Sequence, residues 1–480
     1  MFDQDFVLTG IIFKRSLAFI YLIAFLIIFN QGKALFGENG LLPARLFIKR
    51  IEFWDSPSLF YFKFSDNILK LFSLLGIIIS TLAMGGYTDS YGYLISFLSW
   101  FFLWVVYLSF VNIGQVWYGY GWESMLLETG FLAIFLGPTN LAPSIIIIYL
   151  LRWVSFRNFF GAGTIKWRGD STWRNLTCMS WYYETQPVPN PLSMYFHRLP
   201  LWMHKTSILW TFFAEMIVPF GIFLPWGEIV AICGVLMILF QFLILLSGNL
   251  SWLNYISIVL LIPCFNDEML SKLLTVPEVM THSQIYQYVI YLLGLFVLWR
   301  SIGPIKNLIS SRQIMNTSFD RLHLVNTYGA FGTVTRERNE LVVMGTLDGD
   351  NWQEYEFKGK PTDVNRIPPL MSPYHWRLDW QMWFAAFGDY TDAPWVINLV
   401  NKLLQADKET LGLIKKSPFG AEKPKLIKID YYNYKYQDPG KPGTWKRTYI
   451  GEWLPPLSLD HPEFRKILME QKWMEPNEKI

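Results

Sequence analysis

Three ionisable side chains lie in or beside apolar sequence, where they could transfer protons: Lys166, His197 and Glu128. A lysine that aromatic surfaces shield from water has a lowered pKa and can act as a base or a nucleophile. Histidine is the natural group for proton transfer near neutral pH. A carboxylate at membrane depth is costly and marks a functional site by default. These residue types predict a catalytic site in which Lys166, His197 and Glu128 converge in one cavity.

Basic and aromatic side chains follow one another around Lys166 and predict a site for an anionic group. The set that would bind such a substrate comprises Arg157, Arg168, Asp170, Trp173 and Arg174. Guanidinium groups bind carboxylates and phosphates through paired hydrogen bonds. The alternative is that the basic residues meet lipid phosphates, while the aromatic residues form the belt found at membrane surfaces. The sequence leaves these two interpretations open.

The carboxylates in apolar sequence also have a purely structural interpretation. Glu128 could pair with Arg152 or Arg157 across a helical hairpin, because buried ion pairs often serve only the fold. Glu215 could hold a helix end or line a cavity. The Gly-Ala-Gly sequence at 161–163 is not a dinucleotide-binding motif, because no strand–turn–helix pattern surrounds it.

The polar stretch 152–205, which holds these candidates, interrupts a series of apolar segments. The chain of 480 residues is 52% hydrophobic and 16% charged, against roughly 25% charged residues in soluble domains. A membrane-crossing helix needs about 17–25 apolar residues. The candidate segments are 12–30, 68–84, 92–113, 122–137, 142–160, 205–225, 229–248, 250–265 and 284–303. The sequence therefore predicts a polytopic α-helical membrane domain over 1–310, with about eight or nine transmembrane helices.

The number of crossings decides which side of the membrane the polar loop 161–204 faces. Nine crossings, with Lys14 and Arg15 in the cytosol, would place this loop and the C-terminal region together on the outer face, where they could form a joint site. Loop 31–67 would then also lie outside, although its five basic residues disfavour that side. Eight crossings would reverse the side of the C-terminal region.

Residues 311–480 differ in composition and predict a separate extramembrane domain. They hold 45 charged residues, against 34 in the longer segment 1–310. Residues 328–361 read as three strands with turns at Arg338-Asn339 and at 348–351. Two short amphipathic helices are predicted at 377–389 and 394–405, and two further strands at 425–437 and 444–454. The pattern predicts a β-rich, sandwich-like domain with helical insertions.

An aromatic face in this domain is the candidate for binding another protein. Trp380, Trp383 and Phe384 share one side of the predicted helix 377–389. Aromatic stripes with this spacing usually pack into a core or dock on a membrane, and the alternative is a hydrophobic surface that binds a client protein. The net charge of +3 gives no support to nucleic-acid binding. All three cysteines lie outside this domain, and the sequence predicts no metal site and no cofactor.

Several long segments in one order resemble the lipase maturation factor family. They are WESMLLETGFLAIFLGP at 122–138, the stretch 152–200, NTYGAFGTVTRERNELVV at 326–343, GTLDGDNWQEYEFKGKP at 345–361 and PYHWRLDWQMWFAAFG at 373–388. The residues that match the family's shared segments are Glu123, Glu128, Arg157, Lys166, Arg168, Asp170, Trp173, Gln186, Pro187, His197, Arg377, Asp379 and Trp383. The membrane half is more distantly similar to vitamin K-dependent carboxylase-like transmembrane proteins, a likeness of helix layout alone.

The resemblance implies a polytopic membrane protein whose C-terminal domain lies outside the cytosol. In animals the family sits in the endoplasmic reticulum and helps dimeric lipases to fold and assemble. This compact, cysteine-poor chain, which has no KDEL-like ending, indicates a bacterial member in the cytoplasmic membrane. Two hypotheses follow. The first is an assembly factor whose partners are membrane lipids and an exported lipase or other client. The second is a membrane enzyme that acts on a lipid, quinone or protein substrate at 152–205.

Overall fold

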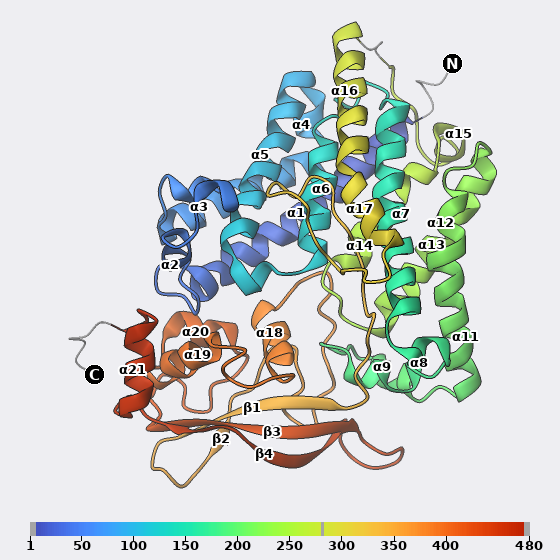
Figure 1. The fold of residues 1–480 in the computed structure, drawn as a ribbon. Helices are drawn as coiled ribbons and strands as arrows, with labels where there is room; N and C mark the ends of the chain where they lie inside the picture. The colour runs from blue at the N-terminus through green and yellow to red at the C-terminus, as the bar shows by residue number, and fades with distance from the viewer. Residues whose placement is uncertain (1–5, 280–282, 475–480) are drawn as a thin grey trace.

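The computed structural model describes residues 6–279 and 283–474 and places a helical region beside a smaller region built on a β-sheet (Figure 1). Among the described residues, six helical stretches are long and apolar enough to cross a membrane. They are α1 (Val7–Phe36), α3 (Asp66–Met84), α5 (Tyr93–Ile113), α7 (Ile145–Arg168), α13 (Gly227–Ser247) and the pair α16 (Gln284–Arg300) and α17 (Ile302–Ile309). Each of them falls on a predicted apolar segment.

Three further apolar segments form helices that are too short or too broken to count among the six. They are α6 (Gly121–Ala133), the run α11 (Leu201–Phe212), η4 (Phe213–Ile217) and α12 (Val218–Gly221), and α14 (Leu253–Val259) with η5 (Ile262–Cys264). The predicted count of eight or nine transmembrane helices is therefore not confirmed as such. Small helices α2 (Ala44–Ile48), α4 (Tyr87–Ser90) and α15 (Asp267–Leu270) lie in the connections.

Serine side chains begin several of the long helices. Ser65, Ser144 and Ser283 each accept a hydrogen bond from a backbone N–H in the first turn of α3, α7 and α16, which satisfies a donor that the helix itself leaves free. The centre of the helical region is aromatic. Tyr21 and Phe25 of α1 are fully buried, and the Tyr107 ring of α5 packs edge-on against both.

The polar stretch forms short helices at the end of the helical region that is nearest to the sheet (Figure 1). Its elements after α7 are α8 (Ser171–Arg174), α9 (Met179–Thr185) and α10 (Ser193–His197). The Asp170 carboxylate begins α8 by accepting a hydrogen bond from the Thr172 N–H at 2.9 Å. Most of α9 is buried between α11 and the sheet region, so this stretch is an internal part of the fold rather than a loose connector.

The C-terminal region contains one four-stranded antiparallel sheet with strand order β2-β1-β3-β4. The strands are β1 (Arg338–Thr346), β2 (Gln353–Glu354), β3 (Leu426–Tyr436) and β4 (Trp445–Leu457). Helices α18 (Arg377–Ala385), α19 (Trp395–Leu404) and α20 (Lys408–Leu413) lie between this sheet and the membrane helices, and α21 (Pro462–Glu470) flanks its edge (Figure 1).

The expected sandwich is not confirmed, because helices, and not a second sheet, cover the inner face of the described sheet. Both predicted helices and the last two predicted strands are confirmed as α18, α19, β3 and β4. The turn at 348–351 is also confirmed, since the Asp348 carboxylate accepts hydrogen bonds from the N–H groups of Asp350 and Asn351 at 2.8 Å. The predicted turn at Arg338-Asn339 is wrong, because β1 begins there.

The two regions are joined by buried polar contacts that come from distant parts of the chain. The Gln31 side chain of α1 donates to the His375 carbonyl at 2.8 Å. Asn249, just after α13, donates to the Pro369 carbonyl at 2.8 Å. Because these donors are almost fully buried, their loss would leave polar groups without partners. The C-terminal region is therefore packed firmly onto the helices.

Candidate functional site

Lys166, the central residue of the predicted site, forms a buried ion pair with Glu215. The Lys166 Nζ lies 2.7 Å and 2.8 Å from the two carboxylate oxygens, and both side chains are 5% exposed. The Trp173 ring lies under the ammonium, with Nζ 5.6 Å from the ring centroid. Both carboxylate oxygens of Glu215 accept hydrogen bonds from the Lys166 ammonium, so Lys166 is engaged by an ion-pair partner in this arrangement.

The local backbone explains how two charged groups from separate helices meet here. Glu215 lies on η4, a π-helical turn inside the run of α11 and α12, and such turns are frequent at functional sites. The backbone of α7 approaches this turn closely at Gly163, where an added Cβ would lie 2.6 Å from the Met216 Cγ. At Gly161 an added Cβ would lie 2.3 Å from the Tyr328 carbonyl oxygen. The two glycines of the 161–163 sequence thus let two different segments pack on α7.

A cavity of about 250 Å³ lies beside this ion pair. Side chains from the helices α7 to α11, η4, α13 and α14 and from residues 330–331 form its walls, and the surface of the cavity is mainly apolar. Its polar lining residues are Asn158, Lys166, Tyr182, Tyr183, Ser207, Trp210, Thr211, Glu215, Gln241, Ser247, Asn254 and Ser257. A mainly apolar pocket with a few polar groups is the usual form of a site for a small molecule.

Glu128 does not line this cavity and forms a different buried cluster. Its carboxylate pairs with the Arg157 guanidinium, as the structural interpretation of the sequence predicted. It also accepts hydrogen bonds from the Tyr328 hydroxyl at 2.6 Å and from the Asn326 N–H and side-chain amide, each at 3.0 Å. The carboxylate therefore serves to hold the 326–328 segment against α6 and α7.

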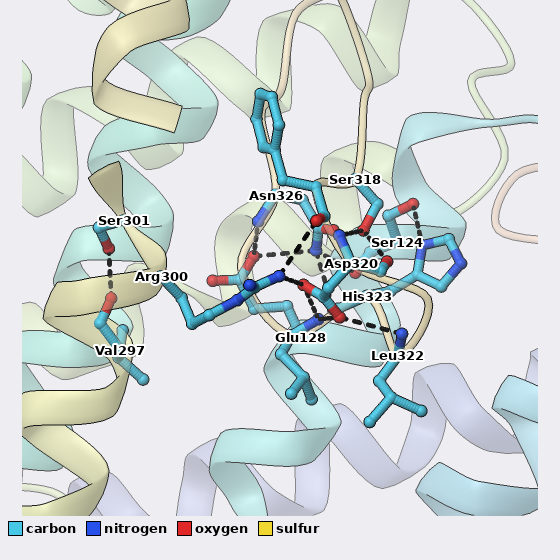
Figure 2. Close-up of polar contacts among 12 residues, drawn as sticks. Ser124, Glu128, Val297, Arg300, Ser301, Ser318, Asp320, Leu322, His323 and Asn326 are labelled. Carbon is cyan, nitrogen blue, oxygen red and sulfur yellow. Dashed lines mark hydrogen bonds and ion pairs between the residues drawn. The ribbon is translucent and has the colours of Figure 1, made fainter. Parts of the chain in front are cut away.

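Figure 2 shows how the chain that leaves the membrane helices is fixed beside this cluster. Asp320 caps its own turn by accepting from the Leu322 N–H at 2.9 Å, and it lies 3.2 Å from the Arg300 guanidinium at the end of α16. The His323 ring lies 3.2 Å from the Ser124 hydroxyl of α6. This connection between the two regions is thus an ordered, hydrogen-bonded segment.

His197 lies outside the cavity, at the edge of the sheet region. Its Nε2 is 3.5 Å from the Glu184 carboxylate, and its ring packs on Tyr436 of β3. Burial, together with the nearby His204 and Arg198, lowers the pKa of His197 to about 4. At neutral pH the imidazole is therefore uncharged, and the contact with Glu184 is not an ion pair.

The three residues of the expected proton-transfer site thus have three different sets of partners. Lys166 lines the cavity, whereas Glu128 belongs to the Arg157 cluster and His197 to the sheet edge. The convergence of these three side chains in one cavity is a wrong prediction. The physical reason is that a buried polar or charged side chain needs a partner, and each of the three has one in its own surroundings. The carboxylate that does meet Lys166 is that of Glu215, for which the sequence predicted either a place at a helix end or a place in the lining of a cavity.

The predicted anion-binding residues are mostly engaged with the protein's own backbone. Arg168 donates to the Leu308 carbonyl at 2.7 Å, and Arg174 donates to the Trp167 carbonyl. The Trp173 indole donates to the Phe331 carbonyl at 2.9 Å. These contacts tie the end of α7 to the segments before the sheet, and the aromatic rings fill the core there rather than stand free.

Two buried charge clusters at the junction were not identified as sites from the sequence. Arg377 of α18 lies 2.8 Å from the Glu123 carboxylate of α6. Arg338 at the start of β1 donates to the carbonyls of Glu184 and Pro187, each at 2.9 Å. The signal available for both was an arginine inside otherwise apolar or alternating sequence, where a buried charge must have a partner.

The predicted client-binding face is only partly exposed. Trp380 is 4% exposed and packs edge-on against Trp122 of α6, with ring centroids 5.2 Å apart, so its assignment to that face is wrong. Trp383 is half-buried, and its indole donates to the Thr185 carbonyl at 3.2 Å. Phe384 is 44% exposed, and Phe387, two residues after the helix ends, is 51% exposed. We call the exposed part, Trp383, Phe384 and Phe387, the α18 edge.

These features define a class: a polytopic helical membrane protein with a mainly apolar cavity beside a buried ion pair and a sheet region docked on one end. Comparison with known proteins gives the family. The profile of the lipase maturation factor transmembrane domain matches residues 8–272, and that of the lipase maturation factor C-terminal domain matches residues 324–455. The chain therefore belongs to the lipase maturation factor family and is an integral membrane protein.

Full-length relatives support this assignment. Lipase maturation factor 1 of Mus musculus is 42% identical over 98% of this chain and 90% of that protein. The Homo sapiens protein of the same name is 42% identical over 98% of this chain and 91% of its own length. Lipase maturation factor 2 of Xenopus laevis is 28% identical, over 95% and 83% respectively. No solved structure shows a significant match.

Proposed function

We propose that this protein assists the folding and assembly of exported lipases, or of related client proteins, at the membrane. The observation that carries the proposal is the 42% identity to lipase maturation factor 1 along 98% of the chain, across both regions. Function then requires a surface that holds apolar parts of an incompletely folded client. The α18 edge supplies exposed aromatic side chains for that purpose.

The α18 edge is expected to be needed for client maturation but not for stability. The double variant Phe384→Asp/Phe387→Asp adds charge to two half-exposed positions, which removes apolar contact area without opening the core. The assay is co-expression with a secreted lipase whose specific activity depends on the mouse relative. The variant should lower the activity per unit of secreted lipase about tenfold, the loss that about 1.4 kcal/mol of binding free energy produces.

A matched control is Ile450→Asp on β4, because Ile450 is 51% exposed, as Phe387 is. This control should leave both the lipase activity and the thermal midpoint of the protein unchanged. Unaltered lipase maturation by the double variant at normal protein levels would contradict the role of the α18 edge. If the wild-type chain has no effect on any such lipase, the proposed function itself is wrong.

An enzyme at the Lys166 cavity is the alternative, and the geometry supports it less well. The cavity offers room for a substrate, but its two charged groups, Lys166 and Glu215, neutralise each other. The expected anion-binding arginines, Arg157 and Arg168, are held by Glu128 and by a backbone carbonyl. For catalysis, Lys166 would first have to leave Glu215, and the arginines would have to leave their present partners to bind an anionic group.

We also propose that the chain crosses the membrane nine times, from an N-terminus in the cytosol. The proposal counts the six long helices together with the three shorter helical segments α6, α11–α12 and α14–η5. Its support is that the start of α1 and the sheet lie at opposite ends of the helical region (Figure 1). The polar stretch and the sheet region would then face outward from a bacterial cytoplasmic membrane, or into the endoplasmic reticulum if the source is eukaryotic.

Cysteine labelling in intact cells tests this topology. In a background with Cys178, Cys233 and Cys264 replaced by serine, Lys441→Cys should react with a membrane-impermeant maleimide, because its side chain is exposed in the sheet region. Leu273→Cys, which is 85% exposed in the connection after α15, should react only after the membrane is permeabilised. The reverse pattern would contradict the proposed orientation.

A further inference from the structure

The cavity beside Lys166 is lined in part by apolar residues that are partly exposed at the outer surface of the helical region. Its rim includes the half-buried Met203 of α11 and Leu243 of α13, which is 40% exposed. The outer faces of these two helices carry exposed apolar side chains, among them Leu209 and Phe242. In the nine-crossing topology proposed above, these helices face the hydrocarbon of the membrane, so the most direct way into this cavity is from the bilayer, through the space between α11 and α13.

Several polar groups that line the cavity have no partner within the described residues. The Asn254 Oδ1 and the Trp210 Nε1 are buried without a hydrogen bond. Asn254 and Gln241 share one hydrogen bond of 2.7 Å, which leaves one group of each amide free. Buried polar groups are normally paired, so this set indicates a polar ligand group that both donates and accepts.

The charges in the cavity select against an ionised ligand. The Lys166 ammonium is compensated by both oxygens of Glu215, so the pair carries no net charge. The hydroxyl protons of Ser257 and Thr211 are already donated to backbone carbonyls. An anionic headgroup would therefore meet no free cation, and bringing its charge into this apolar surrounding would be costly. An uncharged polar head avoids that cost.

We propose that this cavity binds an uncharged, hydroxyl-bearing amphiphile from the bilayer, of the monoacylglycerol class. Its hydroxyl head hydrogen-bonds the Asn254 amide and the Trp210 indole, and its acyl chain leaves the cavity between α11 and α13. The volume of about 250 Å³ accommodates the head and the first part of one chain, at the small end of ligand sites. This site is separate from the α18 edge and does not depend on the proposed client role.

Photo-crosslinking tests the proposal with the full-length protein in phosphatidylcholine nanodiscs. The probe is a monoacylglycerol that carries a diazirine in its acyl chain, and mass spectrometry locates the label. Label is expected on the facing sides of α11 and α13. Unlabelled mono-oleoylglycerol should compete, whereas oleic acid, which is anionic, and methyl oleate, which has no hydroxyl, should not. Competition by methyl oleate equal to that of mono-oleoylglycerol would overturn the assigned head chemistry.

Two variants separate binding in the cavity from general contact with the lipid-facing surface. Trp210→Phe keeps the ring and removes only the indole N–H, and it should weaken competition by about threefold to tenfold, the ratio that one hydrogen bond supplies. Ala162→Leu fills the cavity wall and should abolish labelling of α11 and α13. Trp299→Phe, at a 62% exposed position on α16, is the control and should change nothing. Unchanged labelling of Ala162→Leu would overturn the site.

Discussion

Replacement of Glu128 by alanine is expected to unfold the protein or to leave it barely stable. The substitution leaves the Arg157 guanidinium buried without its partner and removes the acceptor of the Tyr328 hydroxyl and the Asn326 amide. Breaking a buried ion pair on one side costs about 3–5 kcal/mol, a large part of the roughly 5–15 kcal/mol that holds a typical domain folded. The measurement is the thermal midpoint and the monodisperse yield in detergent.

A double variant in which both charges are replaced shows whether the unpaired charge causes the loss of stability. Glu128→Leu/Arg157→Met replaces the pair by apolar groups of similar volume, which is often close to neutral for stability. The double variant should therefore recover much of the stability lost in Glu128→Ala, although the Asn326 and Tyr328 donors still lack an acceptor. A single variant as stable as the wild type would show that the cluster does not stabilise the fold.

Replacement of Arg377 by alanine is expected to detach the C-terminal region from the membrane helices. Arg377 pairs with Glu123 of α6 at 2.8 Å and lies over the Tyr118 ring, 3.8 Å from its centroid. Burial alone would lower the pKa of Arg377. The nearby Glu123 carboxylate, together with Tyr118 and Tyr107, favours the charged guanidinium more strongly, so the pKa of Arg377 is raised. The arginine is therefore charged at every accessible pH, and its removal strands a buried carboxylate at a cost of about 3–5 kcal/mol.

Limited proteolysis measures this detachment, because separation of the two regions uncovers the segment before α18, whose Pro369 and His375 carbonyls accept hydrogen bonds from the helical region. Arg377→Ala should be cut there much faster than the wild type and release a C-terminal fragment. Arg447→Ala is the control, since the Arg447–Glu354 pair is about one-quarter exposed and such pairs contribute about 1 kcal/mol or less. Equal cutting rates for Arg377→Ala and Arg447→Ala would contradict the docking role of Arg377.

The sequence predicted most of the elements and one of the buried pairs. Apolar runs identify the long helices because a membrane span has a minimum length. The Glu128–Arg157 pair was predictable because the hairpin that joins α6 to α7 brings the two positions together. Residues 328–337 were wrongly predicted as a strand. They run along α7 instead, where Gly161 lets the Tyr328 carbonyl approach closely, and such a contact depends on packing between segments far apart in the chain.

The features that sequence reasoning missed all depend on partners from distant segments. Lys166 meets Glu215 only because a π-helical turn brings that carboxylate to α7. Trp380 is buried because Trp122 of the membrane region covers it, which no pattern inside the C-terminal region could show. The cavity itself is bounded by several helices from distant parts of the chain, and its unpaired amide and indole groups become visible only once their surroundings are known.

The docking contacts also bear on how the protein is made. The groups that receive the C-terminal region, including Gln31, Glu123, Thr185 and Asn249, all precede residue 311. During synthesis this receiving surface is therefore complete before the sheet leaves the ribosome. The C-terminal region can then pack its core against helices that are already inserted in the membrane. The two regions thus assemble in the same order in which they are translated.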